Sequence, residues 1–185
     1  MPTRVWFSSD FHFWHSNIIK YCNRPFQNAE EMNEAIITNW NASVRPEDDA
    51  YILGDFAFCP PDKAANIARR LHGKKYLIKG NHDRAKTVEA ILPFFEWAKD
   101  TYLLTVQDKQ SQYGNQQIWL SHYCHLIWPQ QHYGVWHLFG HSHGMCEVPF
   151  TAKSLDVGVD SHLFYPVSYD QIKIYMSQRG GKKGI

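Results

Sequence analysis

Five short polar segments, each directly following an apolar run of strand length, constrain this chain more than any other feature of its sequence. The central segment is Gly80-Asn81-His82-Asp83, which follows Tyr76-Leu77-Ile78. The other four are Asp10-Phe11-His12, Gly54-Asp55, Ser121-His122 and Gly140-His141-Ser142-His143. β-Branched and aromatic runs that stop at Gly, Asn, Asp or Ser are typical of strands. We therefore expect five strand ends to deliver oxygen and nitrogen ligands to one place.

The first half of the chain alternates predicted strands with predicted helices. Strands are predicted over 4–9, 50–53 and 74–78 from their apolar runs. One helix is predicted to begin after Asn28, an N-cap residue with Glu31 three positions on, and another to run from Pro60 toward Gly73. This alternation indicates parallel strands with helices packed on a face of the sheet.

From Thr101 onward the pattern changes to short strand-like runs joined by loops. These runs cover 101–106, 117–120, 135–139, 154–157 and 172–176. The polar segment 107–116 contains a glycine and is expected to form a hairpin. The second half therefore predicts another sheet, mostly antiparallel or mixed. The length of 185 residues suits one α/β domain, which we place at 1–177, with a flexible basic tail at 178–185.

Composition limits the classes of function. A formal net charge of +1 argues against a broad nucleic-acid-binding face, which requires clustered Lys and Arg. No apolar run has the length of a signal-peptide core or a membrane span, so we expect a cytoplasmic protein. The cysteines, Cys22, Cys59, Cys124 and Cys146, form no Cys-x-x-Cys pair, which argues against a zinc finger or a redox motif.

The spacing within two of the polar segments suits metal binding. Side chains at i and i+2 of an extended segment point to the same side, so Asp10 and His12 can face one ion. The same holds for His141 and His143. Each pair alone is also compatible with ordinary turn or surface residues, but five such strand ends together indicate a metal site. The candidate ligands are Asp10, His12, Asp55, Asn81, His122, His141 and His143.

This ligand set predicts the metals and the reaction. Seven ligands are too many for one tetrahedral ion, and two ions that share one carboxylate fit better. A mixed nitrogen and oxygen set favours Mn²⁺, with Fe, Zn²⁺, Co²⁺ or Ni²⁺ as alternatives, over a Ca²⁺ cage. Asp10 and Asp55 neutralise only half of the charge of two divalent ions, so the pocket attracts hydroxide and phosphate. Two metal ions can stabilise both the attacking and the leaving oxygen of an in-line displacement, which predicts phosphoester hydrolysis.

In chain order the segments read DxH, GD, GNHD, a single H and GHxH. From about Val5 to His143, this pattern resembles the calcineurin-like metallophosphoesterase family. The resemblance implies a four-layer α/β/β/α sandwich, in which two mixed β-sheets are flanked by helices and carry a dinuclear metal centre at their edges. It also implies that Asp10, His12 and His143 hold the first metal, that Asn81, His122 and His141 hold the second, and that Asp55 bridges both.

The resemblance places His82 beside the substrate rather than on a metal ion. A protonated His82 would stabilise the developing phosphorane charge and donate a proton to the leaving alkoxide. Asp83 is expected to orient this imidazole and to favour its charged form. His15 and Arg24 are candidates for binding a substrate phosphate, with Arg24 offering a bidentate fork. For both of these residues, an ordinary surface position is the alternative.

The predicted function is a metal-dependent hydrolase in which a metal-bridging hydroxide attacks a phosphodiester or a small nucleotide. A phosphomonoesterase, including a protein phosphatase, is the alternative. A non-catalytic metal-binding scaffold is a further alternative, which the complete set of ligands argues against. The expected partner is a phosphorylated small molecule or nucleotide, or the end of a nucleic acid. We expect no membrane association and no obligate protein partner.

Overall fold

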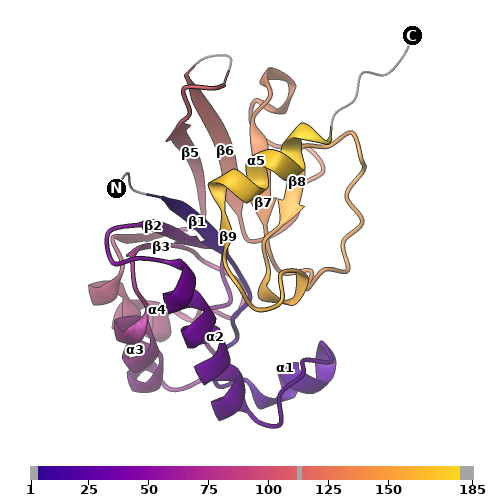
Figure 1. The fold of residues 1–185 in the computed structure, drawn as a ribbon. Helices are drawn as coiled ribbons and strands as arrows, with labels where there is room; N and C mark the ends of the chain where they lie inside the picture. The colour runs from indigo at the N-terminus through magenta and orange to yellow at the C-terminus, as the bar shows by residue number, and fades with distance from the viewer. Residues whose placement is uncertain (1–3, 112–113, 180–185) are drawn as a thin grey trace.

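Two β-sheets form the centre of the structure, a computed structural model that describes residues 4–111 and 114–179. Their strand orders are β4-β3-β2-β1-β9 and β5-β6-β7-β8 (Figure 1). The first sheet consists of β1 (Val5–Ser8), β2 (Asp49–Ile52), β3 (Lys74–Ile78), β4 (Trp97–Lys99) and β9 (Val167–Ser168). The second consists of β5 (Thr101–Gln107), β6 (Asn115–Ser121), β7 (Trp136–Phe139) and β8 (Ser154–Asp156).

Both sheets are mixed. In the first, β1 to β4 are parallel and β9 pairs antiparallel with β1. In the second, β5 and β6 form the predicted antiparallel hairpin, whereas β6, β7 and β8 are parallel. The parallel order brings the carboxyl ends of β1, β2 and β3 to one edge, and those of β6 and β7 to the corresponding edge of the other sheet. The predicted α/β fold of two mixed sheets flanked by helices is confirmed.

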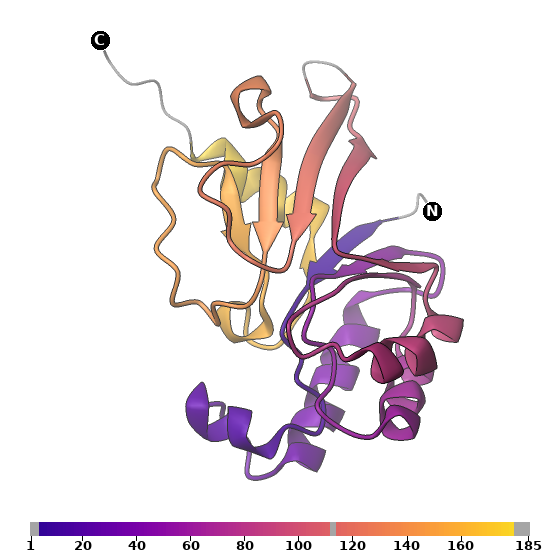
Figure 2. The same ribbon diagram turned by 180° about the vertical axis from the view of Figure 1, so that it is seen from behind.

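The helices are α1 (Ser16–Tyr21), α2 (Ala29–Ser43), α3 (Pro61–Arg70), α4 (Ala85–Ile91) and α5 (Tyr169–Ser177). Short 3₁₀ turns cover Leu92–Phe94, Gln131–Tyr133 and Val159–Ser161. The N-cap predicted for α2 is present, because the Asn28 side chain accepts the backbone N–H of Glu31 at 2.8 Å. Figures 1 and 2 show α2, α3 and α4 together on one side of the first sheet.

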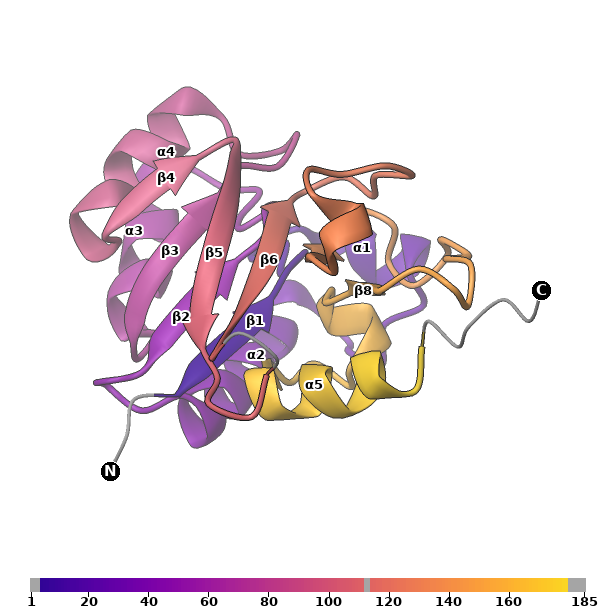
Figure 3. The ribbon, with the colours of Figure 1, turned by 90° about the horizontal axis from the view of Figure 1, so that it is seen from above.

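The buried apolar side chains form two clusters. One joins the first sheet to α2 and α3 and includes Met32, Trp40 and Ile67. The other fills the space between the sheets and includes Phe7 of β1 and Leu120 of β6. In Figure 3, β5 and β6 pass in front of β1 and β2, and α5 lies along the side. The two sheets therefore pack face to face, which holds their polar edges together.

Residues 172–176, predicted as a strand, belong to α5, so this prediction was wrong. The hydroxyl of Ser168 accepts the N–H of Gln171, whose side chain in turn accepts the N–H of Ser168, and this capping box starts a helix. Ile172 and Met176 are buried at helical spacing, whereas Ile174 is 63% exposed. The apolar residues therefore follow the period of a helix and not the alternation of a strand.

Among the residues that the structure describes, no helix is long and apolar enough to cross a membrane. The predicted tail at 178–185 lies outside the described residues from position 180 onward. The short strands β4 and β9 were not predicted, and both lie at the edges of the first sheet.

Candidate metal centre

The five polar segments meet where the carboxyl ends of β1, β2, β3, β6 and β7 come together. Backbone hydrogen bonds connect the loops that follow these strands. The N–H of Asp10 donates to the carbonyl of Gly54 at 3.0 Å, and the N–H of His12 donates to the carbonyl of Asp55 at 2.9 Å. Across the two sheets, the N–H of His141 donates to a carboxylate oxygen of Asp10 at 2.9 Å. The loops of both sheets thus form one connected unit.

One ligand group consists of Asp10, His12 and His143, whose donor atoms lie within 4.8 Å of one another. Asp10 and His12 are buried, and His143 is partly exposed. The Nδ1 atom of His143 is 2.7 Å from a carboxylate oxygen of Asp160. This contact fixes the imidazole and leaves its Nε2 atom for an ion, an arrangement common among metal-binding histidines.

The other ligand group consists of Asp55, His122 and His141, with donor atoms again within 4.8 Å of one another. The Nδ1 atom of His122 is 2.7 Å from the carbonyl of Leu53, which orients the imidazole. Its Nε2 atom is 3.0 Å from the amide oxygen of Asn81, so the predicted Asn81 ligand lies beside this group. All seven predicted ligands are therefore brought to one place.

Asp55, a member of the second ligand group, also lies close to the first group. Its Oδ2 atom is 3.4 Å from Nε2 of His12 and 3.5 Å from Nε2 of His122. Its other carboxylate oxygen accepts the backbone N–H of His82 at 2.9 Å, which fixes the rotation of the side chain. A carboxylate in this position is suited to share two ions, as the predicted bridging role requires.

The chemistry of the donor set fits divalent metal ions. The Nε2 atom of His12 is buried and has no hydrogen-bond partner among the described residues. Burial lowers the pKa of His12 to about 3, so the imidazole is neutral, as a metal ligand must be. The carboxyl of Asp10 is fully buried, and this burial raises its pKa to about 7. Both groups lose hydration on burial, and a divalent ion coordinated by them would compensate for this loss.

The backbone is strained at the ligands. Five of the seven are non-glycine residues with positive φ angles, between 47° and 67°: Asp10, His12, Asp55, His141 and His143. Such left-handed conformations cost about 1–3 kcal/mol each and cluster at active sites, where the surrounding structure enforces them. The strain is the consequence of turning each chain sharply at a strand end so that its side chain faces the centre.

Two glycines permit the close approach of these loops. A Cβ atom on Gly80 would collide with the carboxylate of Asp55, and a Cβ atom on Gly140 would collide with Ser9 and with the carboxylate of Asp10. Both contacts are to ligands or to residues that adjoin them. The absence of a side chain at Gly80 and Gly140 is therefore required for the ligand geometry.

His82 lies beside the first ligand group, with its ring centre 5.3 Å from that of His12. The position of Asp83 differs from the expectation that it orients this imidazole. Its two carboxylate oxygens accept the backbone N–H groups of Gly80, Asp55 and Phe56 at 2.8–2.9 Å. Asp83 therefore holds the turn after β3 against the loop after β2. Its role in this structure is to stabilise the backbone and not to orient the His82 imidazole.

The two predicted phosphate-binding residues differ in position. His15 is partly exposed, and its Nδ1 atom is 3.2 Å from that of His12, so it remains a candidate. Arg24 does not reach the surface: its side chain is fully buried and pairs with Asp160 at 2.7 Å. It also donates to the carbonyls of Asp10 and Phe11, so its donors support the loop after β1 from behind. The prediction that Arg24 binds substrate phosphate is wrong for this reason.

Asp160 is the residue that sequence reasoning passed over. Its carboxylate contacts both His143 and Arg24. Arg24 and Asp160 are 136 positions apart in the chain, and no local pattern connects them. One feature of the sequence could have indicated this ion pair. It is the presence of an acidic residue in a turn together with an arginine that has no role in the family pattern.

Comparisons with known proteins agree with this geometry. The sequence profile of the calcineurin-like phosphoesterase family matches residues 3–149. An uncharacterized protein from Methanocaldococcus jannaschii is 34% identical over 174 residues, which cover 91% of this chain and 89% of that protein. The gene 66 protein of Mycobacterium phage L5 is 23% identical over 188 residues, covering 86% of this chain and 87% of the phage protein.

A solved structure also shares the fold. The crystal structure of a protein of unknown function from Aquifex aeolicus superposes with a TM-score of 0.72 at 25% identity. The match covers 94% of this chain and all of the Aquifex chain. The profile match over most of the chain, together with the convergence of the five polar segments, shows that this protein is a member of the calcineurin-like phosphoesterase family.

Proposed function

We propose that this protein is a dinuclear metal-dependent phosphodiesterase that acts on a small phosphodiester or nucleotide. The observation that carries the proposal is the position of Asp55, a member of one ligand group that lies close to the other, with His82 beside them. Asp55 is within 3.5 Å of both His12 and His122, and the His82 ring centre is 5.3 Å from that of His12. This arrangement supports the hypothesis of a single site with two metal ions and with His82 as the proton donor.

The residues of the chain divide the work between binding and proton transfer. Divalent ions held by the seven ligands would supply an activated water and withdraw negative charge from the phosphoryl oxygens. His82 is not needed to hold an ion and lies on the side that faces solvent, where it is partly exposed. From this position it donates a proton to the leaving oxygen. Such a contribution is typically ~10²–10⁴-fold in rate.

Hydrolysis of two chromogenic substrates tests the proposal. Chelator-treated protein is assayed with bis(4-nitrophenyl) phosphate and with 4-nitrophenyl phosphate, with and without added Mn²⁺. We expect Mn²⁺ to restore cleavage of the diester, and His82→Ala to reduce it by ~10²–10⁴-fold while the bound metal is retained. His132→Ala, which removes an exposed histidine of the turn before β7, is the matched control.

Each other outcome has a defined meaning. Preference for the monoester would replace the diesterase assignment with a phosphomonoesterase. Metal binding without turnover of either substrate would overturn the enzymatic proposal. Full activity of His82→Ala would leave the metal chemistry in place and remove His82 from the mechanism.

A further inference from the structure

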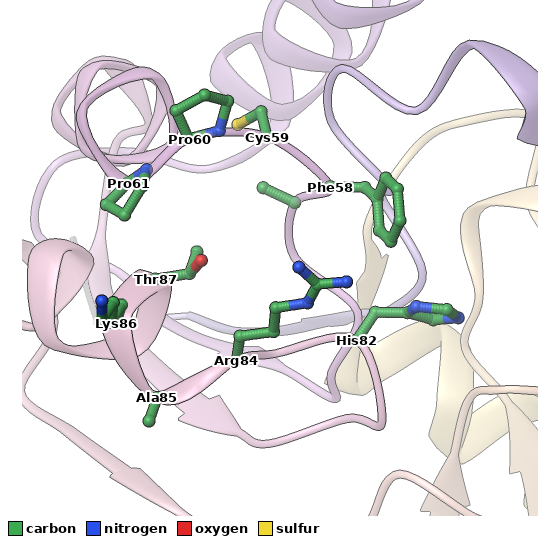
Figure 4. A pocket seen from close by; sticks show the side chains of 10 residues that line it. Phe58, Cys59, Pro60, Pro61, His82, Arg84, Ala85, Lys86 and Thr87 are labelled. Carbon is green, nitrogen blue, oxygen red and sulfur yellow. The ribbon is translucent and has the colours of Figure 1, made fainter.

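A cavity of about 510 Å³ opens next to His82, between the loop 57–61 that leads into α3 and residues 82–87 at the start of α4 (Figure 4). We propose that this cavity binds the leaving group of the substrate, and that this leaving group is a nucleoside monophosphate or a group of the same chemistry. Such a group combines a planar apolar body with a phosphate of its own. The inference rests on the proposed function, because it names the substrate class of the same active site.

His82 connects the cavity to the metal centre. It lines the cavity, its ring lies 5.3 Å from that of His12, and it lies 5.5 Å from the ring of Phe58 on the cavity side. A proton donor must be within reach of the oxygen that departs. The group attached to that oxygen therefore extends past His82, where this cavity receives it.

The walls of the cavity are mainly apolar. Phe58, Pro60, Pro61, Ala57 and Ala85 contribute rings or methyl groups. The Phe58 ring is held in place, because the imidazole of His15 stacks on it with ring centres 4.4 Å apart and 25° between the planes. Rigid rings of this kind offer flat surfaces to a base or a sugar at a small cost in conformational entropy. The volume is within the range of sites that enclose small organic ligands.

The charge of the cavity is positive. Arg84 and Lys86 line it, both are exposed, and neither forms an ion pair with any residue that the structure describes. No Asp or Glu is among the lining residues. Burial raises the pKa of the Cys59 thiol to about 11, so this thiol adds no negative charge. A neutral alcohol would fill the apolar walls but leave two cations without a partner.

Arg84 is placed where a second phosphate would lie. Its guanidinium carbon is 5.5 Å from the centre of the Phe58 ring. In Figure 4 this guanidinium lies between His82 and the end of the cavity formed by Pro60 and Pro61. A phosphate at Arg84 would therefore be the leaving group's own phosphate, separate from the scissile phosphodiester. Water attacks the phosphorus of that diester, the P–O bond to a sugar hydroxyl of the leaving nucleotide breaks, and this oxygen takes a proton from His82. Arginine binds phosphate through paired, charge-assisted hydrogen bonds, which would favour a leaving group that carries a phosphate.

Binding of product-like probes to the full chain tests the proposal without turnover. Adenosine monophosphate, adenosine and inorganic phosphate are titrated by calorimetry, first into chelator-treated protein and then in the presence of Mn²⁺. We expect adenosine monophosphate to bind more tightly than either fragment. Arg84→Ala should weaken this binding about tenfold or more and bring it close to that of adenosine. Arg69→Ala, at the far end of α3, should leave it unchanged.

The outcomes separate this inference from the proposed function. Equal binding of adenosine monophosphate and inorganic phosphate, or an Arg84→Ala variant that binds like the wild type, would overturn the leaving-group site, even if Mn²⁺-dependent diester cleavage is observed. Conversely, Arg84-dependent binding in a protein that cleaves no diester would support the cavity and reject the phosphodiesterase. A second variant, Phe58→Ala, should weaken adenosine binding as well, because it removes an apolar wall rather than a charge.

Discussion

The two sheets contribute different chemistry to the same site. The first sheet supplies every oxygen ligand and one imidazole: Asp10, His12, Asp55 and Asn81. The second sheet supplies only imidazoles: His122, His141 and His143. Each ligand group contains members from both sheets. The comparison teaches that neither sheet contains a complete ligand group by itself, so the packing between the sheets assembles the candidate metal centre.

The loops of the two sheets also differ in burial. The loops after β1 and β2 present Asp10, His12 and Asp55 at 2% exposure or less, and His122 after β6 is equally buried. Asn81 after β3 is exposed. In the loop that follows β7 of the second sheet, His141 is exposed and His143 is partly exposed. The buried loops after β1 and β2 therefore offer the most enclosed candidate ligands. We expect changes to these ligands to have the largest effects.

The largest effect is expected for Asp55→Ala, because this carboxylate belongs to one ligand group and lies close to the other. Its loss removes the shared ligand and leaves the ions to repel each other without compensation. We expect diesterase activity to fall by more than about 10³-fold. Metal content per chain, measured by mass spectrometry, should fall for both ions. Asp62→Ala on the exposed start of α3 is the control, and retention of two ions by Asp55→Ala would contradict the shared position.

A smaller but distinct effect is expected for Asp160→Asn, which weakens the link between Arg24 behind the first sheet and His143 of the second. Residues that orient a metal ligand typically contribute about 10–100-fold in metal affinity or activity. We expect a loss in that range, together with a lower free energy of unfolding because the buried Arg24 loses its counter-charge. Metal titration and urea unfolding measure the two effects. Asp170→Asn, an exposed position in the first turn of α5, should change neither.

The convergence of the candidate ligands was predictable from sequence because they follow strand ends. The extended backbone expected for the pairs at 10 and 12 and at 141 and 143 was wrong, since all four residues have positive φ angles. An apolar run followed by Gly and Asp, as in Gly54-Asp55, indicates where a strand ends and which side chain lies at its carboxyl end. Because β1, β2 and β3 pair in parallel, their carboxyl ends lie side by side. This neighbourhood can be predicted without knowing any long-range side-chain contact. The same reasoning located His122 and the pair at 141 and 143, because β6 and β7 are also parallel.

The supporting residues were not predictable, since their partners are distant in the chain. In the sequence, Arg24 has the features of an ordinary surface arginine. Only the fold shows that Asp160 and two backbone carbonyls accept its hydrogen bonds. Asp83 adjoins His82 in sequence, yet its carboxylate turns to three backbone N–H groups. In α5, the alternation of Ile172, Ile174 and Met176 is typical of a strand, but the capping box at Ser168 starts a helix. Tertiary contacts decided the first two cases, and a local capping box decided the third.

Each sheet also has a buried carboxylate far from the metal centre, and Asp48 of the first sheet should matter more. It accepts the N–H of Arg4, the indole N–H of Trp6 and the guanidinium of Arg45 at 2.6–3.2 Å. Burial acts to raise the pKa of Asp48, but these donors outweigh it and hold the pKa well below its usual range. The stabilisation is therefore complete above the unfolded pKa of about 4 and is lost as the pH falls further.

Asp48→Asn should lower the free energy of unfolding by about 3 kcal/mol at pH 7, since it removes the charge of a buried carboxylate that these donors face. The difference from the wild type should shrink at pH 3, because the carboxyl of the unfolded wild-type chain is then mostly protonated while that of the folded chain is still ionised. Urea unfolding at the two pH values measures this change. An equal difference at pH 7 and pH 3 would show that Asp48 acts through shape and not through charge.

The smallest effect is expected for the matching carboxylate of the second sheet, Asp108. It accepts the hydroxyl of Tyr169 at 2.7 Å and pairs with Lys173, whose side chain is 32% exposed. The hydrogen bond from Lys173 is the main cause of its lowered pKa, so its contribution is also present at neutral pH and lost in acid. Because water and salt reach Lys173, Asp108→Asn should cost only about 1 kcal/mol at pH 7, and less in 1 M salt. Salt should lower the cost of Asp48→Asn less, because Asp48 also accepts the uncharged N–H groups of Arg4 and Trp6. Equal salt dependence of the two variants would remove the contrast between the two carboxylates.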